Sequence, residues 1–467
     1  MNRPNILILM PDQMRADALS CAGHPVIQTP NLDRLAAEGI RFPRAYTTSP
    51  ICMPARSSFL SGLFCHNHGQ WGNYGRLPVT ADTYARRLQA AGYHTCHIGK
   101  SHLYPHRRGH HLKEEEPYMH GLGWADVLET TGPIATCATR SILTDHWESL
   151  GLYETFLNDY RRRGKEGGVA ATWPSPLPPG EAMDDFVGRT ACEYLSSYQR
   201  NEPWLVFVGF GGPHEPWDPP ADWAARYEGR PMDPPQPVPP PESWLTGEAA
   251  RYRESLRERE HPLPPETVAK IRALYYAKIS HIDDWIGRIW QVVERRGWAD
   301  QTAVVFWSDH GEMLGDRNLY HKSLFYDPSA RIPLILRLPD RSAAGSVRPH
   351  LVSLVDITPT VLELAGAEPR KREFGRSLLP IVRQPDAPHH EVVGSEIYYR
   401  TMIRVERYKM VVNDRGAVLE LYDMEKDPLE TRNLAGHSRT GAVVRRLQEQ
   451  LLRWQLATAT DWTQLNA

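Results

Sequence analysis

The chain has 467 residues, which is enough for a large buried core and, at ~150 residues per domain, for about three domains. Its 54 Lys and Arg against 56 Asp and Glu give a formal net charge of -2, which argues against a nucleic-acid-binding protein held by global charge. Hydrophobic residues make up 41% and charged residues 24%, so the chain as a whole is neither disordered nor collagen-like. No apolar run approaches the ~18 residues that a membrane span needs.

The N-terminal segment has one feature of a signal peptide, because Arg3 precedes the apolar run 6–10. This run is shorter than the apolar region of a signal peptide, and residues 11–13 end it without a small-residue cleavage site. We therefore expect a buried strand here rather than a leader. The 6 cysteines form no C-x-x-C pair, which indicates a reduced compartment rather than a disulfide framework. A cytoplasmic location follows as the expectation.

Short apolar runs alternate with helical stretches along the first two thirds of the chain. Continuous apolar runs of this length are typical of strands buried on both faces of a parallel sheet. The runs lie at 6–10, 93–98, 204–208 and 303–307. Two helices are predicted between them: one with Thr29 as N-cap, Pro30 in the first turn and Gly39 at its end, and a longer amphipathic one over 266–296. This alternation predicts a doubly wound α/β domain.

The C-terminal part of the chain has a different pattern. Two runs, 402–413 and 417–422, predict paired strands joined by a turn at 414–416, and a helix is expected from about residue 440 to 457. We therefore predict a catalytic domain over 1–368 and a small α+β subdomain over 369–467.

The segment 213–241 is crowded with proline and cannot form sheet interior or continuous helix. A surface excursion is the plainer interpretation of such a segment. The alternative is a rigid wall beside a functional site, because His214 lies at its start.

Polar residues follow each predicted strand. In open α/β sheets ligands bind outside the carboxyl ends of the strands, so these side chains are expected to converge on one crevice if the strands share a sheet. The residues concerned are Asp12 and Gln13, Lys100 and His102, His214, and Asp309 and His310. Two aspartates and a histidine indicate a divalent cation, since carboxylates suit hard metals and an imidazole shifts preference toward Mn or another transition ion. Each aspartate alone is also consistent with a helix cap or a turn.

The segment 51–62 predicts an anion site. Pro54 can start a helix, and Cys52 would then lie just before the helix N-terminus, where free N–H groups and the dipole favour an anion. Arg56 can clamp a tetrahedral oxyanion in a bidentate way, and Lys100 and Lys322 offer further positive charge. A buried apolar cysteine and solvent-exposed lysines are the alternatives.

Residues 52–56 match the C-x-P-x-R signature of the sulfatase family, in which the cysteine is oxidised after translation to formylglycine. Other segments resemble the family in order along the chain: its opening, its G-K-x-H element, its second metal segment with the distal lysine, and its C-terminal signature. They lie at 4–7 and 29–33, 99–102, 308–322 and 421–434. The resemblance spans nearly the whole chain. It implies the alkaline-phosphatase-like α/β sandwich, with a large, mostly parallel central sheet and a small C-terminal α+β subdomain.

Two positions depart from the commonest sulfatase pattern. Gln13 stands where many members have a second aspartate, and His310 where many have asparagine. This combination resembles the branch that holds phosphonate monoester and phosphodiester hydrolases and choline sulfatases, and it leaves the metal open between Ca and Mn. Lys100 and His102 favour a sulfatase, because the phosphonate hydrolases typically replace that pair. Asn73 lies where this branch has a substrate-contacting asparagine, although a turn residue explains it equally well.

The resemblance implies a sulfate-ester hydrolase. Modified Cys52 would be a geminal diol, one hydroxyl of which, activated by the metal, attacks sulfur. His214, with Lys322, would protonate the leaving alcohol, and His102 would take the proton from the second hydroxyl. The sulfuryl oxygens would be held by Arg56, Lys100, Lys322 and the metal. The implied metal ligands are Asp12, Gln13, Cys52, Asp309 and His310.

The implied partners are a small-molecule sulfate ester and a formylglycine-generating maturation enzyme, with neither nucleic acid nor membrane. A sugar, aryl or alkyl alcohol and a monomer or homo-oligomer all stay open. The main alternative is a phosphonate monoester or phosphodiester hydrolase with the same nucleophile. A non-catalytic metal-binding member of the fold is a third, and it should have lost part of the set that this chain retains: Cys52, Arg56, Lys100 and His214.

Overall fold

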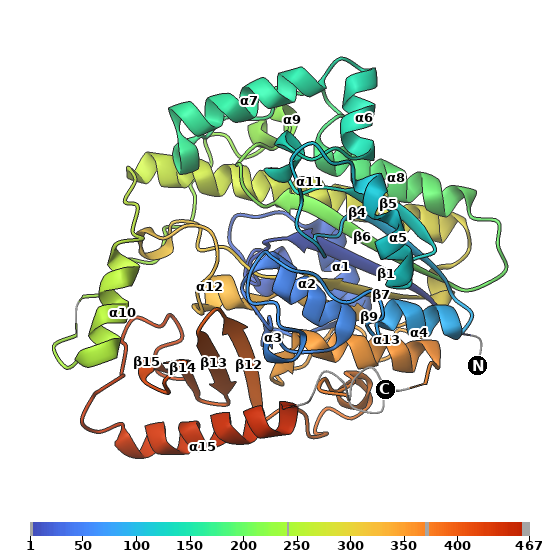
Figure 1. Ribbon diagram of the computed structural model, residues 1–467. Coiled ribbons are helices and arrows are strands. Elements are labelled where there is room, and N and C mark those ends of the chain that lie inside the picture. Colours follow the sequence, from blue (N-terminus) through green and yellow to red (C-terminus); the bar gives the residue numbers. More distant parts are fainter. Residues whose placement is uncertain (1–2, 241, 369–372, 460–467) are drawn as a thin grey trace.

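The computed structural model describes residues 3–240, 242–368 and 373–459, and its centre is an eight-stranded sheet in the order β10-β2-β9-β7-β1-β6-β4-β5 (Figure 1). Strands β7, β1, β6, β4 and β5 are parallel, so their carboxyl ends lie at one edge. Strand β9 runs antiparallel to β7, and β2 antiparallel to β9. The strands are β1 (Asn5–Asp12), β2 (Ile40–Arg41), β4 (His94–Lys100), β5 (Asp126–Thr130), β6 (Trp204–Pro213), β7 (Thr302–Trp307), β9 (Leu334–Arg337) and β10 (Ser346–Val347).

Helices cover both faces of this sheet, as the buried apolar runs predict (Figure 1). Alternate residues of a strand point to opposite faces: Leu7 and Leu9 of β1 pack with α1, α8 and α11, and Ile6 and Ile8 pack with α2, α4 and α13. The doubly wound α/β prediction is thereby confirmed. The helices are α1 (Pro30–Glu38), α8 (Met183–Ser197) and α11 (Pro265–Arg295) on one side, and α2 (Cys52–Ser61), α4 (Tyr84–Ala90) and α13 (Ile357–Ala365) on the other.

The C-terminal part forms an antiparallel sheet, β12-β13-β14-β15, against which α15 (Gly441–Thr458) packs (Figure 1). The strand expected at 402–413 is in fact two strands, because the polar pair Glu406 and Arg407 forms a turn between two apolar runs. The second turn, at 414–416, and the terminal helix lie where they were predicted. These strands are β12 (Val392–Ile397), β13 (Arg400–Val405), β14 (Tyr408–Asn413) and β15 (Val418–Asp423).

A small third sheet, in the order β11-β3-β8, and several short helices complete the described chain. The proposed domain boundary at 368/369 adjoins residues 369–372, which lie outside the described residues. No helix within the described ranges combines the length and the apolarity that crossing a membrane requires. The remaining elements are β3 (Ala45–Tyr46), β8 (Arg331–Ile332), β11 (Val352–Ser353), α3 (Cys65–His68), α5 (Glu116–Gly121), α6 (Ile142–Ser149), α7 (Tyr153–Glu166), α9 (Ala221–Ala225), α10 (Gly247–Arg257), α12 (Asp327–Ala330) and α14 (Leu379–Arg383).

The proline-rich segment 213–241 is only partly the surface excursion that its composition favours. Strand β6 continues into it as far as Pro213, and the large side chains of Trp217 and Tyr227 are buried in the core cluster that contains α11. His214 at its start is also buried. The first half of the segment is therefore packed structure beside the carboxyl edge of the sheet, whereas residues 228–240 are largely exposed or half-buried.

Candidate active site

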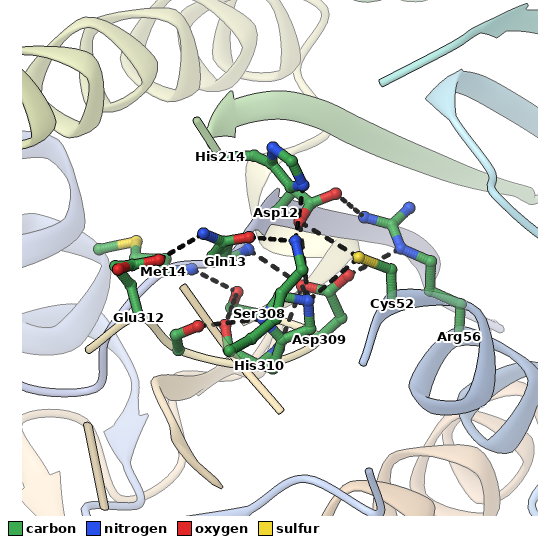
Figure 2. A network of polar contacts seen from close by, with 12 residues as sticks. Asp12, Gln13, Met14, Cys52, Arg56, His214, Ser308, Asp309, His310 and Glu312 are labelled. Carbon is green, nitrogen blue, oxygen red and sulfur yellow. Dashed lines mark hydrogen bonds and ion pairs between the residues drawn. The ribbon is translucent and has the colours of Figure 1, made fainter. Parts of the chain in front are cut away.

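The carboxyl edge of the parallel strands gathers the polar residues that the sequence places there. Asp12 ends β1, Asp309 follows β7, and Figure 2 shows both pointing toward Cys52 and His310. One ligand atom from each of these four buried residues lies within 4.8 Å of all the others. The convergence of Asp12, Asp309 and His310 that their strand ends predict is therefore what the fold produces, and α2 brings Cys52 to the same place.

Cys52 is the first residue of α2, rather than the residue before it as expected. Extended Ile51 serves as the N-cap, and Pro54 occupies the first turn, where its missing N–H breaks no helical bond. The Cys52 Sγ lies 3.1 Å from His310 Nε2 and 3.9 Å from Asp12 Oδ1. The side chain is the unmodified thiol, so Sγ marks where an oxygen of an oxidised side chain would lie.

Asn73 contacts the start of the same helix. Its Oδ1 accepts the backbone N–H of Met53 at 3.1 Å, which satisfies one of the free donors of the first turn. The residue is exposed and lies in the loop before α4. This contact gives Asn73 a capping role, and its contact with substrate stays a prediction.

Arg56 bonds differently from the oxyanion clamp that the sequence suggests. Its Nε donates to Asp309 Oδ2 at 2.8 Å, and one terminal nitrogen donates to Asp12 Oδ2 at 3.0 Å. The other terminal nitrogen donates to the backbone carbonyls of Lys100 and Ser101. A buried guanidinium beside two buried carboxylates pairs with them, because either partner alone would carry an uncompensated charge. Arg56 therefore ties three parts of the site together, and Figure 2 shows its contacts with the two aspartates.

The donor set fits a divalent cation. Burial and Cys52 raise the pKa of Asp12, but Lys100 and Arg56 outweigh them and hold it below its usual range. Burial lowers the pKa of His310, yet Asp309 and Cys52 raise it to about 9, so His310 carries a proton in the metal-free protein and must release it to become a ligand. His310 Nε2 lies 3.9 Å from one carboxylate oxygen each of Asp12 and Asp309. One ion with bonds of about 2.0–2.6 Å can span such pairs.

Gln13 joins the site to two acidic residues that the sequence did not single out as functional. Its backbone N–H donates to Asp309 Oδ1 at 3.0 Å, and its side-chain oxygen accepts from Lys322 Nζ. The side-chain nitrogen donates to Glu215 Oε2 at 2.7 Å and also to Glu312. In this orientation the amide oxygen faces Lys322, and the role of Gln13 as a metal ligand stays a prediction. The position of Glu215 directly after His214 was the available signal.

His214 and Lys322 lie against each other at the edge of the cluster. His214 Nδ1 donates to the backbone carbonyl of Glu215 at 2.7 Å, which leaves Nε2 as the acceptor for Lys322 Nζ at 2.6 Å. Burial lowers the pKa of Lys322, but Cys52 and Glu215 raise it above the ordinary lysine value. Lys322 therefore holds its proton firmly, while Lys100 pairs with Asp12 across the site.

His102 contacts Cys52, and its sequence neighbours belong to a buried network. Burial lowers its pKa, which favours a neutral imidazole, and its backbone φ of 49° lies in the left-handed region. The preceding Ser101 donates from its hydroxyl to Glu129, and Tyr104 donates to the other oxygen of Glu129 at 2.6 Å. Burial raises the pKa of Glu129 to about 7. Sequence inspection missed Glu129, because nothing in β5 marks it.

The central sheet thus holds a cysteine, two aspartates and a histidine in one buried cluster, which is a candidate metal site on an alkaline-phosphatase-like fold. The family model described as Sulfatase matches residues 4–367, and the one described as N-sulphoglucosamine sulphohydrolase, C-terminal, matches 315–457. The chain belongs to the sulfatase family, whose enzymes are sulfuric ester hydrolases.

Its relatives span nearly its whole length. An arylsulfatase of Clostridium perfringens is 29% identical and covers 92% of this chain and 90% of its own. A choline-sulfatase of Rhizobium meliloti is 28% identical over 94% of this chain and 83% of its own. The crystal structure of a phosphonate monoester hydrolase of Agrobacterium radiobacter matches with a TM-score of 0.79 at 24% identity, over 98% of this chain and 96% of that one. At this identity the last match supports the fold alone.

Replacing Arg56 by lysine should weaken metal binding about 10- to 100-fold, the usual effect of changing a group that orients metal ligands. Lysine keeps the charge but cannot hold Asp12 and Asp309 with a planar fork. Titration calorimetry with Mn²⁺ measures the change. Arg162→Lys, which alters a surface pair with Glu166, is the matched control and should bind as the wild type does. Equal affinity in both variants would contradict the bridging role.

Glu129 should make the protein less stable as the pH rises. A carboxyl with a pKa of about 7 when folded and 4.5 when unfolded keeps a proton that the unfolded chain releases, so stability falls between pH 4.5 and 7 by about 3 kcal/mol. Glu129→Gln lacks this titration, so its free energy of unfolding should decrease less than that of the wild type as the pH rises over the same range. Urea denaturation from pH 5 to 8 tests this. The surface variant Glu258→Gln should follow the wild-type profile, and a parallel profile for Glu129→Gln would refute the assignment.

Proposed function

We propose that this protein hydrolyses sulfate monoesters to an alcohol and inorganic sulfate, with formylglycine derived from Cys52 as the nucleophile and one divalent cation. The supporting observation is the position of Cys52. Its Sγ lies inside the cluster of Asp12, Asp309 and His310, at the N-terminus of a fully buried helix. Such a position favours negative charge developing on a substrate bound at this residue.

Two groups must be added to the chain for this reaction. We propose that a formylglycine-generating enzyme oxidises Cys52, and that Asp12, Gln13, Cys52, Asp309 and His310 hold Mn²⁺ or Ca²⁺. The imidazole of His310 favours Mn²⁺, and the carboxylates suit either ion. When bound, the cation supplies Lewis-acid stabilisation of the sulfuryl oxygens and lowers the pKa of a hydroxyl next to it.

The charged side chains divide into two groups with different tasks. Lys100 and Lys322 present ammonium groups toward the cluster, which suits them to hold the sulfuryl oxygens. Arg56 contributes through the two carboxylates and the Lys100 backbone that it holds. It is therefore a positioning residue with a long-range charge rather than a direct clamp.

His214 is the proposed proton donor to the leaving alcohol. Its Nδ1–H bond to the Glu215 carbonyl fixes the ring so that Nε2 faces Lys322 and the cluster, and Nε2 must gain a proton, in place of accepting the bond from Lys322, before it can act as the acid. Lys322, whose raised pKa makes it a poor acid, suits electrostatic stabilisation better than proton transfer. His102, with its lowered pKa and its contact with Cys52, is the proposed base that takes the proton from the second hydroxyl of the modified residue.

A phosphonate monoester or phosphodiester hydrolase is the second candidate. It is favoured by Gln13 and His310, which depart from the common sulfatase pattern, and it would use the same nucleophile. The Lys100 and His102 pair, both near Cys52, favours the sulfate ester.

The substrate is proposed to be a small molecule. The free thiols of all 6 cysteines support a reducing, cytoplasmic location. The protein is a monomer or a homo-oligomer, and light scattering would distinguish the two by their mass in solution.

Protein made together with a maturation enzyme should carry an aldehyde at residue 52 and should hydrolyse aryl sulfates with a higher kcat/KM than aryl phosphonate monoesters. Peptide mass spectrometry measures the modified fraction, and activity should rise in proportion to it. Cys137→Ala changes an exposed cysteine and should leave both readouts unchanged. Full activity with an unmodified Cys52 would eliminate the mechanism, and faster phosphonate hydrolysis would select the second candidate.

The His214→Ala variant should hydrolyse alkyl or sugar sulfates about 10²- to 10⁴-fold more slowly, with a much smaller loss on nitrophenyl sulfate, because an acid matters most for a poor leaving group. The loss should appear in kcat, since the proton moves in the transition state. Lys322→Ala is the comparison: it removes charge from the sulfate itself, so both substrates should suffer alike. Equal losses on both substrates for His214→Ala would make Lys322 the preferred donor.

A further inference from the structure

A second group of metal-ligating side chains lies outside the active site, between the catalytic domain and the C-terminal sheet. Asp356 ends the short 3₁₀ turn Leu354–Asp356 that leads into α13, and His389 and His390 precede β12 (Figure 1). One ligand atom from each of the three lies within 4.8 Å of the others. The proposed hydrolytic mechanism uses none of them.

The carboxylate of Asp356 is the fixed point of this group. It is fully buried, and its oxygens accept the backbone N–H groups of Ser353 at 2.8 Å and Arg376 at 2.7 Å. These bonds anchor the side chain independently of the histidines. His389 is buried, whereas the His390 side chain is 12% exposed. The site therefore has a rigid interior ligand and a partly accessible outer one.

The spacing of the three side chains suits a small tetrahedral ion. Bonds of about 2.0–2.2 Å from Zn²⁺ to nitrogen and oxygen, at tetrahedral angles, place two ligand atoms roughly 3.3–3.4 Å apart. His389 Nε2 lies 3.2 Å from Asp356 Oδ2, which is close to that distance. His390 Nε2 lies 2.7 Å from the other carboxylate oxygen, Oδ1, so an ion bound at Oδ2 requires the His390 ring to leave Oδ1 and turn toward the ion, which its partial exposure permits.

The two histidines border open space from which a further ligand can reach an ion. His389 and His390 line a cavity of about 600 Å³, together with Phe64, Arg376 and Trp454 of α15. A water molecule in this cavity can complete the coordination. Two imidazoles and one carboxylate also form a softer donor set than the two carboxylates and one imidazole of the active site, so the two sites should prefer different ions.

We propose that Asp356, His389 and His390 form a second metal site, which binds Zn²⁺ and ties the C-terminal sheet to the catalytic domain. Strand β12 carries this tie toward the active site. The N–H of its Glu396 donates to the carbonyl of Thr48 at 2.8 Å, and the Glu396 carboxylate bonds His66 of α3. Thr48 precedes Cys52 by four residues, so an ion that holds β12 also steadies the segment leading to the nucleophile.

Zinc stoichiometry tests this site directly. The full-length protein is stripped with a chelator, loaded with Zn²⁺, freed of excess metal and measured by plasma mass spectrometry. We expect His389→Ala/His390→Ala to hold one equivalent of zinc fewer than the wild type. The matched control is His110→Ala/His111→Ala, which removes another adjacent histidine pair and should hold as much zinc as the wild type. Equal zinc content in the two double variants would overturn the proposal.

A spectroscopic measurement covers the case in which the His389→Ala/His390→Ala variant does not fold. The Asp309→Ala protein keeps both histidines and loses an active-site ligand. X-ray absorption of its zinc-loaded form should show two imidazoles and oxygen ligands at about 2.0–2.2 Å. Zinc should also raise its Tm. A zinc shell without an imidazole pair would reject the second site, and neither result depends on hydrolytic activity, so the proposed function is tested separately.

Discussion

Two carboxylates buried at the ends of neighbouring parallel strands are the constraint on which the rest of this structure depends. Asp12 and Asp309 have no exposed surface, and their charges must be balanced inside the protein. Arg56, which bonds both carboxylates, and Lys100, which pairs with Asp12, supply that balance. Arg56 thereby fixes α2 against the ends of these strands, and Cys52 lies one turn before Arg56 on the same helix. The position of Cys52 is therefore linked to charge compensation.

The site has two sides with different chemical environments. Lys322 contacts His214 directly and reaches the acidic residues Glu215 and Glu312 through Gln13. Burial lowers the pKa of Lys322, but Cys52 and Glu215 outweigh it and raise that pKa above the ordinary lysine value. Burial lowers the pKa of His102, so the surroundings shift proton affinity in opposite directions at these two residues.

The C-terminal sheet does more than cover the catalytic domain. Its first strand contacts the segment before Cys52 through Glu396, and its start lies beside the histidines that face Asp356. The same strand therefore joins two polar clusters at its two ends. The family model described as N-sulphoglucosamine sulphohydrolase, C-terminal, begins at residue 315, well before the first strand of this sheet. The C-terminal part that it describes therefore includes residues that precede the sheet.

The sequence by itself determined the α/β class, four of the parallel strands and the gathering of Asp12, Asp309 and His310, because apolar runs and polar strand ends are local signals. The place of Cys52 among them came from the resemblance to the sulfatase family. The turn at 406–407 escaped detection, since a short polar pair interrupts two apolar runs only slightly. Only the tertiary structure decided the bonding of Arg56, the involvement of Glu215 and Glu129, and the meeting of Asp356 with His389 and His390. Their partners are distant in sequence or carry no local pattern, and a buried charge chooses its partner by the space and the dielectric around it.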